Sequence, residues 1–299
     1  RAPMMTAQAM IISAEKSLFI FPCNRFILGQ GRSAEGELAA IKMKGEAGLK
    51  EKGFKSTGED RVLKKEDTYL IVIEPLIVPE ERYNTPSEPD PYPADYDKLA
   101  ERYEVDYFIV ASRHWAKSGR PSLTMHPTGN FGKAMYGGRP RELQRTAPNA
   151  MRDIYLRILE DPPEDFEVSL EATHHSPTIF SVPMFFAEVG SREEQWRDRD
   201  VCNYLVECIL RGIEDEGDAR VAIGFGGGHY CPYFSPKMRE YAFGHIAAKY
   251  AIPLLSMDLV EQMVEKSGTA ELAILDSGLK SNERRKVEGL LSRLDLDVI

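Results

Sequence analysis

The 299-residue chain has 47 acidic and 38 basic residues, so its formal net charge is −9. Hydrophobic residues make up 42% of it and charged residues 28%, a balance typical of globular proteins with a large core. No apolar run approaches the roughly 18 residues that a membrane helix needs, and the segment SLFIF at 17–21 is too short for a signal peptide. We therefore expect a cytoplasmic protein that does not bind membranes, and the acidic net charge argues against DNA as a partner. We also expect a monomer rather than an obligate oligomer.

Short apolar runs predict the strands, and helical spacing of apolar residues predicts the helices between them. The predicted strands, in chain order, are 68–74, 106–112, 167–172, 220–225 and 270–276. The predicted helices are 199–215, 235–250, which opens with the favourable pair Ser235-Pro236, then 256–266 and 281–294. Most of the strand runs are continuously apolar, which indicates strands buried on both faces of a parallel or mixed sheet.

The alternation of strands and helices predicts one α/β domain over 1–299, with a layered, mixed or mostly parallel sheet flanked by helices. Residues 1–60 give a weak signal and are assigned as an irregular N-terminal portion of that domain. The proline-rich, acidic segment 79–97 is predicted to be a surface loop. Four cysteines without a CxxC pair argue against a disulfide framework, and Cys202 and Cys208 fit the buried face of a helix.

Five of the six histidines follow three of the predicted strands. They are His114 and His126 after 106–112, His174 and His175 after 167–172, and His229 after 220–225. Ligands of open α/β sheets bind beyond the carboxyl ends of strands. We therefore expect these histidines to share one site at one edge of the sheet.

The segment GFGGGHYCP at 224–232 has neither the lysine of a P-loop nor the spacing of a dinucleotide fingerprint. Glycine has no Cβ, so the N–H groups of Gly226, Gly227 and Gly228 can approach a ligand oxygen closely. His229 is a candidate general base or metal ligand. We assign these four residues to catalysis; the alternative is a turn with a hydrogen-bonded histidine, and Cys231 is expected to be a small buried residue.

The segment EATHHSPT supplies two further candidates for catalysis, His174 and His175. In an extended chain they point to opposite sides, unless the following Ser-Pro pair makes a sharp turn. Histidines with a carboxylate suit zinc, although the HExxH motif is absent. The candidate metal ligands are His174, His175, His229 and Glu188, and two exposed surface histidines are the alternative.

Seven basic residues and one acid lie between 113 and 145, which makes this segment locally basic on an acidic chain. Basic and hydroxyl side chains suit phosphate oxygens, and Trp115 or Phe131 can stack on a base. The candidate substrate-binding residues are Arg113, His114, Lys117, Ser118, Arg120, His126, Thr128, Asn130 and Lys133. The alternative is a solvated loop with a structural tryptophan.

Several of these segments together resemble the archaeal and plant type of D-aminoacyl-tRNA deacylase. They are ASRHWAKSGRPSLTMHPTGN, LEATHHSPT, VPMFFAEVGS, EEQW and GFGGGHYCP. The resemblance implies a fold similar to peptidyl-tRNA hydrolase and phosphorylase-like proteins. It also implies hydrolysis of the ester between a D-amino acid and the terminal ribose of tRNA, with zinc as cofactor and the aminoacylated 3′ end of tRNA as partner. Ser176 and Cys231 depart from the family's pattern, in which glycine and alanine are expected.

Three other functions are compatible with the residues themselves. A zinc-dependent exopeptidase or amidase would not need the basic segment. An RNA-binding module without catalysis would not need the histidines to converge. A nucleoside phosphorylase would show turnover that depends on phosphate.

Overall fold

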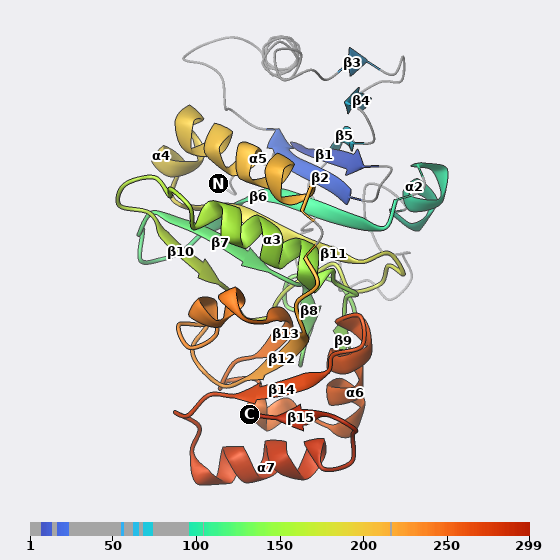
Figure 1. The fold of residues 1–299 in the computed structure, drawn as a ribbon, viewed down its shortest axis with the longest axis vertical. Helices are drawn as coiled ribbons and strands as arrows, with labels where there is room; N and C mark the ends of the chain where they lie inside the picture. The colour runs from blue at the N-terminus through green and yellow to red at the C-terminus, as the bar shows by residue number, and fades with distance from the viewer. Residues whose placement is uncertain are drawn as a thin grey trace.

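A computed structural model describes residues 7–13, 17–23, 55–56, 62–65, 68–73, 96–103, 105–215 and 217–299. Two larger β-sheets with helices packed against them, and a two-stranded sheet, form this described part of the chain (Figure 1). The α/β class predicted from the sequence is thereby confirmed. None of the described helices is both long and apolar enough to cross a membrane.

The large sheet is mixed, with the described strands in the order β10-β7-β11-β6-β2-β1-β5-β4-β3. The strands are β1 Ala7–Ser13, β2 Ser17–Cys23, β3 Lys55–Ser56, β4 Val62–Lys65, β5 Thr68–Ile73, β6 Tyr107–Trp115, β7 Ser122–His126, β10 Glu167–Leu170 and β11 Met184–Ser191. Strand β11 runs parallel to β6 and antiparallel to β7, whereas β10 runs parallel to β7. The N-terminal segment thus contributes β1, β2 and β3 to the same sheet that carries the histidine-bearing strands.

The small sheet is parallel throughout and has the order β13-β12-β14-β15. Its strands are β12 Val221–Phe225, β13 Ala242–Ala247, β14 Leu272–Leu275 and β15 Asp297–Val298. A short hairpin, β8 Gly129–Asn130 with β9 Glu142–Leu143, lies between the two sheets in the ribbon view (Figure 1).

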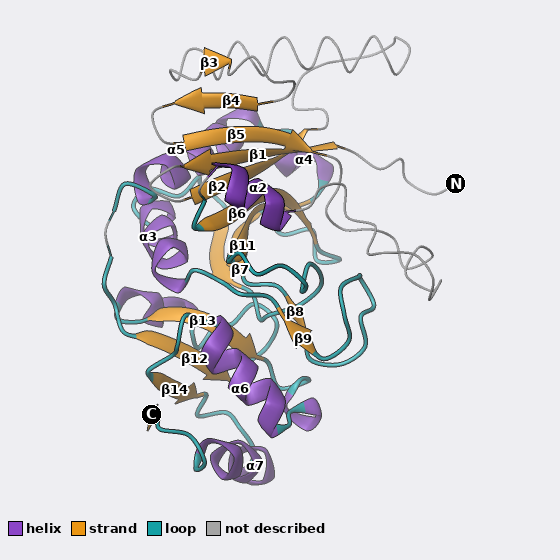
Figure 2. Cartoon of the chain, turned by 90° about the vertical axis from the view of Figure 1, so that its right-hand side faces the viewer, coloured by secondary structure: helices purple, strands orange, loops and turns teal. Residues whose placement is uncertain are grey.

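The described helices are α2 Tyr96–Tyr103, α3 Pro148–Ile158, α4 Glu193–Trp196, α5 Arg199–Gly212, α6 Met257–Lys266 and α7 Ser281–Leu291, with 3₁₀ turns η2 Ser235–Arg239 and η3 Ile252–Leu254. Helix α5 begins where Asp198 accepts hydrogen bonds from the N–H groups of Asp200 and Val201. Helices α3 and α5 pack against each other over the large sheet, and α6 and α7 accompany the small sheet (Figure 2).

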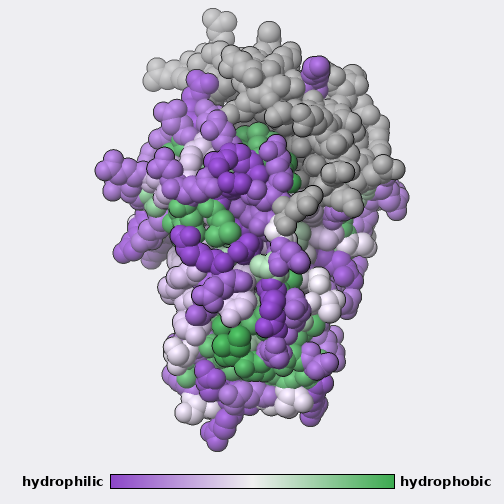
Figure 3. Space-filling view, viewed as in Figure 1, coloured by the Kyte–Doolittle hydropathy of each residue, from purple (hydrophilic) through white to green (hydrophobic). Residues whose placement is uncertain are grey.

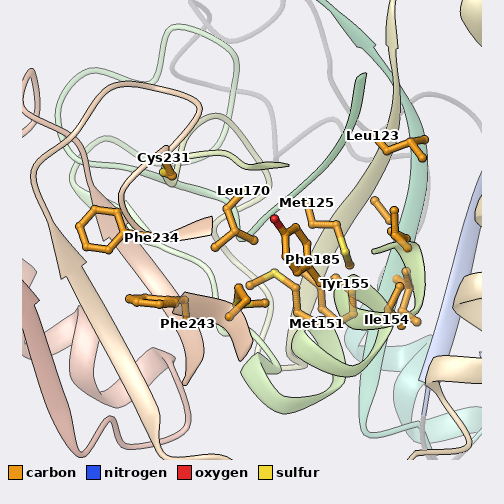
Figure 4. Close-up of a cluster of buried hydrophobic side chains, with 14 of the residues drawn as sticks. Leu123, Met125, Met151, Ile154, Tyr155, Leu170, Phe185, Cys231, Phe234 and Phe243 are labelled. Carbon is orange, nitrogen blue, oxygen red and sulfur yellow. The ribbon is translucent and has the colours of Figure 1, made fainter. Parts of the chain in front are cut away.

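One hydrophobic cluster extends from the large sheet to the small sheet (Figure 4). Met125 and Phe185 of the large sheet pack with Tyr155 of α3, and the cluster continues to Phe234 and Phe243 beside the small sheet. Each such side chain stabilises the fold by about 1.5–3 kcal/mol when fully buried. This shared core holds the two sheets in a fixed relation, which positions loops of both sheets around one site.

The surface of the described residues is mostly polar, in contrast to the apolar core. In the view of Figure 3, hydrophilic residues cover most of the described surface, with hydrophobic areas between them. Helices α3 and α5 turn their apolar residues inward, and Cys202 and Cys208 are buried free thiols on α5, as the sequence predicts.

Most predicted elements are present, with shifted ends, but the helix predicted at 235–250 is wrong. That segment forms the short turn η2 and then strand β13, whose six residues are all buried. A continuous apolar run fits a strand covered on both faces as well as it fits a helix, so periodicity alone misassigned it. The polar loop predicted after 106–112 contains strand β7, and Tyr96 and Asp97 of the predicted surface loop belong to α2. The remainder of that loop, 79–95, lies outside the described residues.

Candidate functional site

A carboxylate in the middle of the large sheet anchors the site. Glu188 of β11 is paired with Ser112 of β6 on one side and Thr124 of β7 on the other. His114 and His126 each lie two residues further along their strands, and side chains two apart share a face. His114 Nδ1 is accordingly 3.4 Å and His126 Nε2 is 3.7 Å from Glu188 Oε2.

A second carboxylate, Glu171, follows strand β10 and is fully buried. Its N–H donates to the carbonyl of Met125, which fixes the segment beside β7. Three histidines surround its oxygens: His114 Nδ1 at 3.1 Å, His174 Nε2 at 3.5 Å and His229 Nε2 at 2.8 Å. We call the seven residues of this site the histidine–carboxylate cluster: His114, His126, Glu171, His174, His175, Glu188 and His229.

Both adjacent histidines face the cluster. His175 has a φ of 45°, an uncommon left-handed conformation, and its ring lies 4.4 Å from that of His174, centroid to centroid. Their rings are 4.2 and 4.9 Å from that of His126. The sharp turn left open by the sequence is therefore the observed one, and both histidines reach the same site.

The convergence of five histidines is confirmed, but the single sheet edge predicted for it is wrong. Strand β7 runs antiparallel to β11 and hence opposite to β6, so the carboxyl ends of β6 and β7 lie at opposite edges. His114 and His126 lie on the same face of the sheet, and the loops after β10 and β12 bring His174, His175 and His229 over that face.

A backbone hydrogen bond holds the glycine-rich segment against the loop after β10. The N–H of Ala172 donates to the carbonyl of His229 at 2.7 Å, which joins the loop after β10 to the loop after β12. His229 Nδ1 is 3.2 Å from the Tyr250 hydroxyl, and His114 Nε2 is 3.0 Å from the Tyr230 hydroxyl. The two tyrosines, each partly exposed, border the cluster on this side.

Charge balance inside the cluster keeps both carboxylates ionised. Burial alone would raise the pKa of Glu171, but the contact with His229 and the charge of His126 outweigh it and lower that pKa. Burial is likewise opposed at Glu188, where hydrogen bonding to His114 and His126 lowers the pKa to about 2. The same contacts with Glu188 outweigh burial at His114 and His126 and raise the pKa of each.

The adjacent histidines behave in the opposite way. Burial, followed by the charge of His126, lowers the pKa of His175 to about 4 and that of His174 well below its ordinary value. Both rings are therefore neutral at neutral pH, the form in which imidazole binds metals and accepts protons.

The cluster contains three sets of residues that could hold a metal ion. Within each set, one ligand atom per residue lies within 4.8 Å of the others, and the sets are His126, His174 and His175, then Glu171, His174 and His229, and finally His114, Glu171 and Glu188. The ligands predicted from sequence, His174, His175, His229 and Glu188, are thus distributed over different sets. Sequence reasoning left Glu171 out of the ligand list, although its place at a strand end just before two histidines was a usable signal.

The three-histidine set fits a metal in its hydrogen bonding. Nδ1 of His126 donates to the carbonyl of Pro127, that of His174 to Ala172 and that of His175 to Ser176. Such backbone contacts fix the tautomer and leave Nε2 as a ligand, as in many metal sites. His126 Nε2 and both oxygens of Glu171 are buried without a hydrogen bond of normal geometry, so donor atoms suited to a cation are present.

One glycine of the predicted catalytic trio must be corrected. The N–H of Gly226 donates to the carbonyl of Ala247 at 2.8 Å, so it is not available to a substrate oxygen. In the described part of the chain the N–H groups of Gly227 and Gly228 make no hydrogen bond, and a Cβ at Gly228 would meet open space. These two remain candidates.

The predicted substrate-binding residues separate into three groups. His114 and His126 belong to the histidine–carboxylate cluster. Thr128 and Asn130 are buried, and their side chains donate to the carbonyls of Pro177 and Gly137, so they brace loops and do not face a nucleic acid. The exposed group, which stays available for RNA, comprises Arg113, Lys117, Ser118, Arg120 and Lys133.

Arg113 of the exposed group takes part in one cation–π contact, and its neighbour on the same face of β6, Trp115, takes part in another. Arg113 and Trp115 alternate with His114 on β6, so they point away from the cluster's face. The Arg113 guanidinium lies 5.5 Å from the ring of Trp196, and that of Arg192 lies 5.1 Å from the ring of Trp115. Arg120 is partly engaged, because its guanidinium is 3.3 Å from Glu167.

The sixth histidine and the last cysteine are structural. His245 is fully buried, with Nε2 donating to the carbonyl of Gln144 at 2.9 Å and Nδ1 3.1 Å from the Thr173 hydroxyl. Cys231 is buried as expected, and its thiol contacts the carbonyl of His229. Both side chains contact segments that carry residues of the cluster or lie next to them.

Comparison with known proteins adds the family. A family model described as D-aminoacyl-tRNA deacylase matches residues 101–299, which carry every residue of the cluster. This chain belongs to the D-aminoacyl-tRNA deacylase family. A relative with that name from Methanosarcina mazei is 40% identical over 198 residues, which cover 64% of this chain and 66% of the relative. Another from Archaeoglobus fulgidus is 36% identical over 196 residues, covering 64% and 70%.

The length of the family's members varies. A deacylase from Methanocorpusculum labreanum is 38% identical over 206 residues, but the matched part is only 46% of that protein. Among solved structures, the crystal structure of the conserved protein of unknown function AF0625 superposes with a TM-score of 0.71 at 30% identity, covering 82% of this chain and 85% of that one. The fold of this chain is therefore shared with a solved protein; the predicted likeness to peptidyl-tRNA hydrolase stays a prediction.

Proposed function

We propose that this protein hydrolyses the ester bond of D-aminoacyl-tRNA and releases a free D-amino acid and tRNA. The observation that carries the proposal is the meeting of five histidines and two ionised carboxylates on one face of the large sheet, in a chain of the deacylase family. Its matched relatives are themselves named D-aminoacyl-tRNA deacylases.

The geometry supports a general-base role for His229. Its Nε2 faces the buried carboxylate of Glu171 at 2.8 Å, which stabilises the imidazolium that forms when the ring accepts a proton. Its Nδ1, on the other side of the ring near Tyr250, is the atom that takes the proton from an attacking water. The same imidazolium then returns a proton to the ribose oxygen as the ester bond breaks.

The free N–H groups of Gly227 and Gly228 support a role in holding the carbonyl oxygen. An oxygen that becomes negative during ester hydrolysis is stabilised by donors that are already in place, at about 3–4 kcal/mol for one donor. The glycines let the substrate approach the backbone closely. Glycine at these positions is therefore explained by the chemistry and not by the turn alone.

We propose zinc as the cofactor, held by His126, His174 and His175. The neutral rings of His174 and His175 and the backbone-bonded Nδ1 atoms of all three histidines support this set over the others, and a bound zinc ion would take the place of the proton on His126 Nε2. A bound zinc ion would polarise the ester carbonyl and lower the pKa of a water. Glu171 and His229 would then remain free for proton transfer.

We propose that the exposed basic residues near Trp115 bind the phosphates of tRNA. Arg113 and Lys117 carry positive charge on a chain whose net charge is −9, and their neighbour Trp115 is 67% exposed. Contacts of this kind bind RNA through its backbone, independently of base sequence. We further propose that the protein acts in the cytoplasm, where tRNA is charged, and as a monomer.

The test is a comparison of substrates with the purified protein. D-tyrosyl-tRNA, L-tyrosyl-tRNA and an aminoacyl anilide are incubated separately, and the released amino acid or aniline is measured. The proposal expects release of D-tyrosine, much slower release of L-tyrosine and no cleavage of the anilide. Cleavage of the anilide without deacylation would instead identify an exopeptidase or amidase.

A further inference from the structure

The carboxyl ends of three parallel strands of the small sheet meet beside the cluster. Because β13, β12 and β14 run in the same direction, the loops after them leave from one edge, where α/β sheets bind ligands. Backbone hydrogen bonds join these loops: Lys249 N–H donates to Gly227 at 3.1 Å, and Asp276 N–H donates to Phe225 at 2.9 Å. The proposed catalysis uses only the first of the three loops, the glycine-rich one.

An acidic side chain lies directly against the glycine-rich segment. Asp276 is 9% exposed, and its Oδ1 accepts a hydrogen bond from the N–H of Gly278 at 2.7 Å. A Cβ at Gly226 would lie 2.7 Å from the Cβ of Asp276, and one at Gly227 would lie 3.5 Å from its Oδ2. Within the described residues Oδ2 has no hydrogen-bond or ion-pair partner, so one acceptor of a largely buried side chain is left for a ligand.

A basic side chain lies beside this carboxylate without neutralising it. A Cβ at Gly278 would lie 3.3 Å from both Lys249 Nζ and Asp276 Oδ1, so the two charged groups border the same glycine. Lys249 is exposed, and its ammonium forms no ion pair with any residue that the structure describes. An acceptor and a cation next to open backbone suit a ligand that has both hydroxyl groups and a phosphate.

We propose that this strand-end site, formed by Gly227, Gly228, Lys249 and Asp276, binds the 3′-terminal ribonucleotide of the RNA substrate. Asp276 accepts a hydrogen bond from a ribose hydroxyl, and Lys249 contacts the phosphate on the 5′ side of that nucleotide. The inference rests on the proposed deacylase function and names the part of the substrate that the site recognises.

The position of the strand-end site relative to the cluster fits this assignment. His229 lies two residues beyond Gly227, so the two Cα atoms are at most about 7 Å apart. A ribose bound to Asp276 through one hydroxyl would therefore present its esterified neighbouring hydroxyl near His229. The same nucleotide cannot be held by Arg113 and Trp115, because these two exposed residues of β6 point away from the face that carries His114 and the cluster.

The experiment measures binding of AMP, adenosine and the trinucleotide CpCpA to the full chain by isothermal titration calorimetry. Variants D276N and K249M are compared with wild type and with E261Q, which alters an exposed carboxylate of α6 outside the site. Asparagine keeps an oxygen for the N–H of Gly278, and Lys249 is exposed, so neither change should unfold the protein; thermal denaturation verifies this.

We expect D276N to weaken binding of both AMP and adenosine about tenfold, because a hydrogen bond to a charged acceptor is lost. K249M should weaken binding of AMP about tenfold and leave adenosine unchanged, since only AMP carries a phosphate. E261Q should match wild type. CpCpA should bind at least as tightly as AMP if the ligand is an RNA end, whereas tight AMP with no CpCpA binding would indicate a free nucleotide and overturn the proposal.

Deacylation by the wild-type protein separates this inference from the proposed function. With D-tyrosyl-tRNA, D276N and K249M should raise KM and leave kcat within a few-fold. If wild type deacylates D-tyrosyl-tRNA but both variants bind AMP and CpCpA as wild type does, the strand-end site is wrong and the function stands. If AMP and CpCpA bind as expected but no ester is hydrolysed, the function is wrong and the site remains a ribonucleotide site.

Discussion

Replacing Glu171 with glutamine removes one buried negative charge from the histidine–carboxylate cluster and preserves the side-chain volume. Glu171 is fully buried and lies within 3.5 Å of ring nitrogens of His114, His174 and His229. Glutamine cannot stabilise a positive charge on His229 as a carboxylate does. The variant should therefore be impaired chiefly in the step that moves the proton of water.

The expected size of the effect differs between rate and stability. Loss of a general base's function typically costs 10²–10⁴-fold in rate, which corresponds to about 3–5 kcal/mol in the barrier. The free energy of unfolding should change by less, about 1–3 kcal/mol for polar groups that lose a partner, because His114 keeps Glu188 at 3.4 Å and the cost of burying a second carboxylate disappears.

The assay is single-turnover deacylation of D-tyrosyl-tRNA with enzyme in excess, together with urea denaturation of the same preparations. E167Q is the matched control, because Glu167 lies four residues earlier and its side chain is 66% exposed. E167Q should react at nearly the wild-type rate. A folded E171Q protein that deacylates within threefold of wild type would refute the role assigned to Glu171.

Three further changes test other parts of the site. Removal of metal by a chelator should abolish turnover and zinc should restore it, with elemental analysis reporting the zinc content; full activity of metal-free protein would contradict the cofactor. The double variant R113A/K117A should bind tRNA more weakly, and the slope of log affinity against log salt should fall by about 1 per lost phosphate contact. An unchanged slope would mean that other residues bind the phosphates of the RNA. Burial lowers the pKa of His245 to about 3 from about 6.5, so the unfolded chain binds more protons between these values. The free energy of unfolding should then fall by about 1 kcal/mol more in wild type than in H245Q between pH 7 and 5.5, and equal pH dependence in urea denaturation would refute this.

The sequence predicted the parts of the fold that depend on local pattern. The apolar runs at 221–225 and 272–275 are strands, and 199–212 is a helix, because composition and spacing within a dozen residues decide these elements. The grouping of histidines in strand-end loops also predicted that they would meet. The direction of β7 could not be predicted, because its antiparallel pairing with β11 depends on contacts between residues 60 to 68 positions apart.

The site depended on the same long-range information. Glu171 and His229 lie 58 positions apart in the sequence, and they touch where a backbone hydrogen bond joins the loops after β10 and β12. Nothing in the local sequence distinguishes the engaged N–H of Gly226 from the free N–H of Gly228, because Ala247, the partner of Gly226, lies on another strand. The burial of Thr128 and Asn130 could not be predicted for a similar reason. Polar side chains in a polar segment are expected to be exposed, and their burial depends on the loops to which they donate hydrogen bonds.

The central claim is that the histidine–carboxylate cluster hydrolyses the ester, with His229 handling the proton of the attacking water. The most direct test is the single-turnover rate of D-tyrosyl-tRNA deacylation by His229→Ala at saturating enzyme, with circular dichroism of the same sample. The account predicts a folded protein whose rate is about 10²–10⁴-fold below wild type. A folded variant with the wild-type rate would contradict this claim, and the glycine-rich segment would then be interpreted as a structural turn without a catalytic role.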